Sequence, residues 1–177
     1  MVRSAQGRYQ EAATLYGLSS KKAGTAIDMD NKSNDAWFEL PQTIYYLGLL
    51  EFNDKKYEAA DRKWKSYLLI ARKFTTKFPN DSKWLREESY ALNNLGSSAL
   101  RQGKADSALV YFKKSVVLKQ TIARLSPKDP DKKYDLIDTR SWLASALEAK
   151  GDFLEASQGY DSVITDLRSL LEQKKNA

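Results

Sequence analysis

Apolar side chains recur at steps of three and four residues along most of the chain, the spacing of one face of an α-helix. Leu109, Phe112 and Val116 form one such series. Strand-like clusters joined by two-residue hairpin turns are absent from the sequence. The pattern predicts an all-α protein, with helices over residues 6–28, 34–53, 56–77, 82–101, 105–125, 132–149 and 152–173.

Turn-forming residues set the predicted helix ends. Ser82 and Asp131 are expected to be N-caps, because short polar side chains accept hydrogen bonds from the first helical amides. Pro41 falls inside the second predicted helix, which is therefore either kinked or begins there. Three more prolines are expected to stop the helices before them: Pro79, Pro127 and Pro130.

A period of 48 residues runs through the chain. Shifting the sequence against itself by this period produces one column of alanines and one of aromatic residues, which chance does not explain. A further column falls at the turns, and Lys55 is its only residue that is not glycine. The three columns are Ala12, Ala60, Ala108 and Ala156; Tyr16, Trp64, Phe112 and Tyr160; and Gly7, Lys55, Gly103 and Gly151.

The columns resemble the core motif of the tetratricopeptide repeat (TPR), in which a Leu-Gly pair precedes a glycine, an alanine and an aromatic residue. In one unit this motif is Leu95, Gly96, Gly103, Ala108 and Phe112. The usual repeat has 34 residues, so each helix here is longer by about two turns. This long-helix variant is often appended to bacterial signalling and regulatory proteins.

The resemblance implies a right-handed α-α superhelix, a solenoid of about seven antiparallel helices. The whole chain, residues 1–177, would be a single TPR-like array. Its expected parts are the second helix of a partial repeat (1–30), one repeat over 31–78, one over 79–126, and a last repeat with the C-terminal end over 127–177.

Small residues stand where helices are expected to cross. Glycine is a poor helix former, so we interpret Gly96 and Ala108 as packing residues that let the two helices of a repeat approach. Phe112 would fill the space beyond them. Gly103 is expected at a turn, where a positive φ is useful. None of these residues is predicted to be a functional site.

The composition disfavours catalysis. The chain has no cysteine and no histidine, so disulfides, thiolate metal sites and histidine-activated nucleophiles cannot form. Phosphate-binding glycine loops are also absent from the sequence. We therefore expect no enzymatic activity, no cofactor and no metal.

Targeting signals are also lacking. No apolar run approaches the roughly 18 residues that cross a bilayer, so no membrane span is expected. The sequence fits a cytoplasmic location, and a periplasmic one is also compatible with it.

The resemblance further implies that the first helix of each repeat lines a concave groove, where a peptide or helix of a partner protein binds. Aromatic anchors beside polar rims are typical of binding hot spots. In the alternative interpretation, a neighbouring repeat covers some of these side chains. The predicted groove residues are Phe38, Tyr45, Leu49, Phe52, Asn53, Tyr90, Asn93, Ser97, Arg101 and Tyr134.

Positive charge gathers on the predicted second helices. Residues 54–80 carry eight Lys or Arg against three acids, and residues 103–128 carry six against one. A solvated face that keeps the array soluble is the favoured interpretation. The alternative function is a regulatory module whose basic convex surface engages nucleic acid or another acidic partner, with nucleic acid ranked below protein. That surface would comprise Lys65, Arg72, Lys113 and Lys114.

The repeat register places residues 1–30 in the position of a second helix, so its first helix would precede Met1. Tyr9 and Tyr16 would then lack a partner helix. Either the chain is a piece of a longer protein, or a second copy covers this face. The register therefore predicts a homodimer or a further association through residues 5–27.

Overall fold

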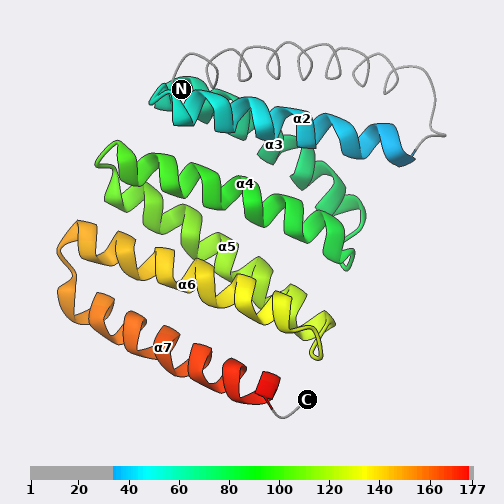
Figure 1. The fold of residues 1–177 in the computed structure, drawn as a ribbon. Coiled ribbons are helices and arrows are strands. Elements are labelled where there is room, and N and C mark those ends of the chain that lie inside the picture. The colour runs from blue at the N-terminus through cyan, green and yellow to red at the C-terminus, as the bar shows by residue number, and fades with distance from the viewer. Residues whose placement is uncertain (1–33, 176–177) are drawn as a thin grey trace, which may run out of the picture. The chain divides into compact units, whose positions relative to one another are not determined.

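The computed structural model describes residues 34–175, and within this range the chain is helix and turn with no strand (Figure 1). The predicted all-α class is confirmed, and the predicted helix ends lie within a few residues of the observed ones. The helix predicted over residues 6–28 lies outside the described residues. The described helices are α2 (Asn34–Asn53), α3 (Tyr57–Lys77), α4 (Ser82–Arg101), α5 (Ala105–Leu125), α6 (Pro130–Lys150) and α7 (Phe153–Lys175).

The chain divides into two compact units, Met1–Ile70 and Ala71–Ala177, and the boundary falls within α3. In the described part of the first unit, α2 packs on α3 through Trp64, which is 1% exposed. The indole Nε1 of Trp64 donates a hydrogen bond of 3.2 Å to the carbonyl oxygen of Tyr45. The ring of Phe52 lies 5.4 Å from that of Trp64.

In the second unit, α4, α5, α6 and α7 lie side by side, each packed on the next (Figure 1). One cluster of its core joins Ala99, Ala108 and Phe112 to Ala146 of α6. The alanine column is buried as predicted: Ala60 and Ala108 are 0% exposed and Ala156 is 3% exposed. Ala12, the first member of that column, lies outside the described residues.

The glycine column marks the turns between paired helices. Gly103 and Gly151 have φ values of +69° and +94°, which confirms the positive φ predicted for Gly103. Lys55 occupies the same repeat position with φ +62°, the one non-glycine residue with positive φ in the described range. A side chain is strained in this left-handed region.

Aromatic rings fill the space that the helical glycines leave open. A Cβ atom built on Gly96 would lie 2.7 Å from the Phe112 ring, and one built on Gly48 would meet the Trp64 ring even more closely. The predicted role of Gly96 as a packing residue is thus confirmed. The close approach is between the glycine backbone and the ring itself.

Both predicted N-caps are wrong. Asp81, rather than Ser82, caps α4 by accepting a 2.8 Å hydrogen bond from the Lys83 amide. At α6 the cap is Asp129, which accepts from the amide of Asp131 at 2.9 Å. In both places several short polar residues compete for one position, and the backbone conformation decides among them.

One proline behaves differently from expectation, and a second decides between two alternatives. Pro130 is the first residue of α6 rather than a stop after α5, at a position where proline's missing N–H is harmless. Helix α2 begins at Asn34 and runs through Pro41, so it does not begin at the proline.

Among the helices of residues 34–175, none is both long enough and apolar enough to cross a membrane.

Candidate protein-interaction surface

The predicted groove residues of α2 are partly used in packing on α3. The Tyr45 ring lies 6.0 Å from that of Tyr67, and the Phe52 ring lies 5.4 Å from that of Tyr57. Both side chains are half-buried, as is Leu49, whereas Asn53 is exposed. The side chain of Phe38 lies outside the described residues.

In the second unit, the predicted groove residues of α4 reach α6. The Tyr90 hydroxyl donates to Asp135 Oδ2 at 3.3 Å. The Asn93 amide nitrogen donates to Thr139 Oγ1 at 2.9 Å. These two bonds run between the first helices of successive repeats, and they hold one face of α4 beside one face of α6.

Lys119 of α5 lies beneath this contact, and the sequence analysis did not single it out. It is 3% exposed, its Nζ donates to the Asp135 carbonyl oxygen at 3.1 Å, and it lies 5.2 Å from the centre of the Tyr90 ring. Burial lowers the pKa of the Lys119 ammonium. The sequence did contain a signal that this position is buried, because the other residues of its repeat column are all apolar: Ala23, Ala71 and Leu167.

The environment of Tyr90 favours its neutral form. Burial and, next, the nearby Asp135 carboxylate raise the pKa of Tyr90 to about 12. Tyr90 is therefore an uncharged hydrogen-bond donor at neutral pH. With Lys119 and Asp135 it forms a polar cluster that ties α4, α5 and α6 together.

Two amide side chains on α4 keep unused hydrogen-bonding atoms. Asn93 Oδ1 and Asn94 Nδ2 are buried and have no hydrogen-bond partner. A buried polar atom left without a partner costs about 1–3 kcal/mol. A ligand would reach these atoms only by displacing the side chains that cover them.

The remaining groove residues of the second unit line the same helices. Ser97 is half-buried and Arg101 is exposed. Tyr134 of α6 is 56% exposed, and Trp142 on the same helix is 39% exposed. Trp142 was not among the predicted groove residues. Its ring stacks 6.2 Å from that of Phe112.

The predicted basic surface is not uniform. Lys65, Lys113 and Lys114 are exposed. Arg72 is instead paired, because its Nε donates to Glu88 Oε1 of α4 at 3.0 Å. The Arg72 side chain is nevertheless 46% exposed, so all three predicted basic residues of the second unit reach solvent.

Comparison with known proteins shows likeness at the level of structure. No family model matches the chain, and no curated protein matches it. The crystal structure of BtubC (BKLC) from P. vanneervenii is similar over 95% of this chain and 76% of its own, with 16% identity and a TM-score of 0.52.

A more distant likeness is to a Podosopora anserina kinesin light chain with nearly identical TPR-like repeats. It has 13% identity and a TM-score of 0.40, over 98% of this chain and 91% of that one. The class follows from the repeated motif, the packed helix pairs and the match to BtubC: the chain has a TPR-like, all-α helical-repeat fold.

Proposed function

We propose that this chain is a protein-interaction scaffold whose first repeat helices, α4 and α6 among them, bind a peptide or a helix of a partner protein. It acts by binding, without a catalytic step and without a cofactor. The long-helix form of its repeats, which resembles modules of bacterial regulatory proteins, supports a place within a larger signalling or regulatory protein.

The observation that supports this proposal most is the hydrogen bonding of the Asn93 side chain. Its amide nitrogen is fixed by Thr139, which orients a carbonyl oxygen that has no hydrogen-bond partner. Such an oxygen can accept a hydrogen bond from a backbone N–H of a bound peptide. Tyr134 and Trp142 on α6 add partly exposed aromatic rings, the side chains that most often anchor a partner.

Site-specific photo-crosslinking tests the proposal. A benzophenone amino acid replaces Tyr134 in one protein and Val110, which is 50% exposed on α5, in a control. We expect a partner to be captured from position 134 and not from position 110. Capture from position 110 alone would place the binding surface on the second helices instead.

A matched pair of alanine variants then measures the contribution of the anchor. Tyr134→Ala is expected to weaken binding of the captured partner by about tenfold or more, the effect of losing an aromatic hot spot. Leu154→Ala removes a side chain that is 73% exposed on α7 and should leave affinity unchanged. Equal affinities for wild type and Tyr134→Ala would contradict the assignment.

The exposed lysines Lys113 and Lys114 favour a second candidate function, in which the basic face of α5 engages nucleic acid or another acidic partner. Binding to nucleic acid weakens steeply with salt, because counterions are released from the phosphates. Affinity that falls steeply with salt and is lost in the Lys113→Glu/Lys114→Glu variant would establish this function in place of the first.

A further inference from the structure

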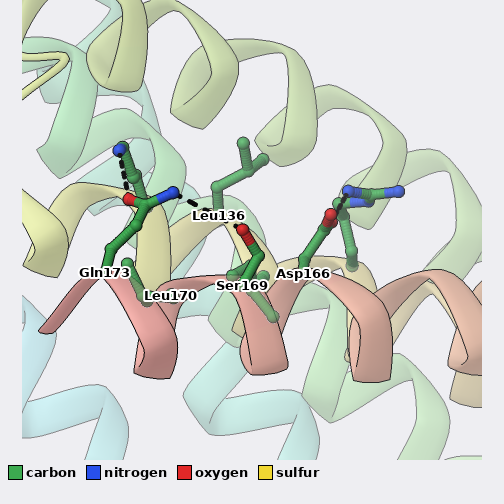
Figure 2. Close-up of a pocket in the computed structure, with 8 residues that line it drawn as sticks. Leu136, Asp166, Ser169, Leu170 and Gln173 are labelled. Atoms are coloured by element: carbon green, nitrogen blue, oxygen red, sulfur yellow. Dashed lines mark hydrogen bonds and ion pairs between the residues drawn. The ribbon is translucent and has the colours of Figure 1, made fainter. Parts of the chain in front are cut away.

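The pair formed by α6 and α7 holds a pocket of about 320 Å³. Figure 2 shows Leu136 on one side and Asp166, Ser169, Leu170 and Gln173 of α7 on the other. Lys133, Ile137 and Arg140 of α6 complete its lining.

A second pocket, of about 600 Å³, lies between α5 and α6. Lys133 and Leu136 line both pockets. The two pockets therefore lie on either side of these two residues, and we call them together the α6 trough. The α5 side of the trough is lined by Gln120, Ala123, Arg124 and Pro127.

The α6 trough has an excess of positive charge. Its one carboxylate, Asp166, pairs with Arg140 (Figure 2), which also donates to Ser162 Oγ at 2.6 Å. The other two cations bond neutral groups. Lys133 Nζ donates to Gln173 Oε1 at 3.2 Å, and Arg124 Nη2 donates to Thr121 Oγ1 at 3.1 Å. Two positive charges thus remain beside an apolar floor.

Several positions along the trough differ from those of the preceding helix pair. One repeat earlier, the positions of Lys133, Ile137, Arg140 and Leu170 are filled by side chains that are almost fully buried. Ile137 is buried as well, at 6% exposed, whereas Lys133, Arg140 and Leu170 are half-buried. The earlier residues are Leu85, Ser89, Leu92 and Ile122, which are 4%, 0%, 1% and 3% exposed.

We propose that the α6 trough docks an acidic amphipathic segment of a partner protein. Apolar side chains of that segment lie on Leu136, Ile137 and Leu170, and its carboxylates pair with Arg124 and Lys133. The apolar floor favours protein over nucleic acid, whose outer surface is phosphate. The net charge of +6 on this chain disfavours a second copy, because like charges repel.

The probe is a synthetic helical peptide of about four turns, with leucines along one face and glutamates elsewhere. Titration into ¹⁵N-labelled protein should shift the amide signals of Lys133, Leu136 and Gln173. The Arg124→Glu/Lys133→Glu variant should bind about tenfold more weakly or worse, as expected when a complementary charge pair becomes repulsive.

The matched control is Arg62→Glu/Lys63→Glu, which makes the same change in net charge at two exposed residues of α3 that do not line the trough. It should bind the peptide as wild type does, and circular dichroism should confirm that both variants are folded. An equal loss of affinity in the control would overturn the proposal, because the attraction would then be general rather than local.

Four other results would also overturn it. The first is that the glutamate peptide leaves the amide signals of the trough unshifted, and the second is that a peptide with lysines in place of the glutamates binds equally well. Laurate shifts the trough amides while the peptide does not, which would assign the trough to a small amphipathic anion. Sedimentation finds a dimer that Leu136→Glu dissociates, which would assign it to a second copy. None of these results bears on the surface around Asn93 and Tyr134, so failure here is distinguishable from failure of the proposed function.

Discussion

The α4–α5 and α6–α7 pairs share one repeat pattern and yet are held together by different forces. In the first pair, Phe112 is 0% exposed and its ring lies against Gly96. In the second pair, Ala144 and Tyr160 stand at these two positions. The Tyr160 side chain is only half-buried, and its hydroxyl donates to Glu148 Oε2 at 2.9 Å.

Two features distinguish these positions: the ring of Trp142 on α6 stacks on Phe112, and the methyl group of Ala144 stands where the first pair has Gly96. The Cβ of Ala144 occupies the space that the aromatic ring uses above Gly96. A Cβ atom built on Gly159 of α7 would lie 3.1 Å from the Ala144 Cβ, so the backbone of α7, rather than a ring, lies against Ala144. The hydroxyl of the half-buried Tyr160 ring also shares a 2.9 Å hydrogen bond with Ser145 Oγ.

The positions beside this helix crossing also become more polar in the second pair. Leu92 and Leu118 of the first pair are replaced in the second by Arg140 and Asp166, which form an ion pair. The first pair is thus apolar at these positions, whereas the second combines buried Ala144, Ala156 and Val163 with an ion pair beside the α6 trough.

The largest expected difference in stability is between variants of the two aromatic residues, Phe112 and Tyr160. Phe112→Ala should destabilise the protein by about 3–5 kcal/mol, as for other buried phenylalanines. Tyr160→Ala should cost less than about 2 kcal/mol, because it removes a half-buried ring and its hydrogen bonds. Chemical denaturation of both variants measures the difference, and equal losses would mean that the two crossings are equivalent.

The seam residues provide the next comparison. Leu92→Ala is expected to cost about 2–5 kcal/mol through lost burial and a new cavity. Arg140→Ala, at the same repeat position, should cost no more than about 1 kcal/mol, the usual range for a solvent-accessible ion pair. Thermal unfolding of the two variants measures both losses of stability. A larger loss of stability for Arg140→Ala would mean that the ion pair is the main interaction that stabilises the second pair.

Adding the methyl group of Ala144 to the first pair should reproduce part of the difference. Gly96→Ala is expected to cost about 1–3 kcal/mol through overpacking against Phe112. Phe112→Leu should relieve the clash, so that the double variant loses less stability than the sum of the single ones. Strict additivity in this double-mutant cycle would show that the methyl group does not act through the ring.

The smallest expected change in stability is in the turn between α2 and α3, which we compare with the turn at Gly103. Lys55→Gly should stabilise the protein by about 1 kcal/mol, because glycine adopts positive φ without strain. Gly103→Lys, the reverse change in a turn with open space around the glycine, should cost a similar amount. A loss of stability in Lys55→Gly, measured by denaturation, would mean that the lysine side chain itself is needed.

Much of the fold was predictable because it depends on local pattern. The apolar period and the glycine column placed α4 and α5 within their observed bounds, and the alanine column identified residues that are buried. The cap residues were missed because Asp81 and Ser82 are neighbours with the same capping chemistry. Backbone conformation alone chooses between them.

The candidate site was less predictable because it depends on contacts between helices. Lys119 looks like part of a solvated basic helix until α4 and α6 are placed around it, although its apolar repeat column was a visible signal. The α6 trough arises from what side chains of α5, α6 and α7 leave unfilled. No spacing in one segment specifies such a space.

Hydrogen exchange of the native protein tests most directly whether the two pairs differ as described. Amides of Ala105–Leu125 should exchange at least about tenfold more slowly than those of Phe153–Lys175, because an apolar seam opens at higher free energy than a polar one. Equal protection of the two helices, or slower exchange in α7, would contradict the account.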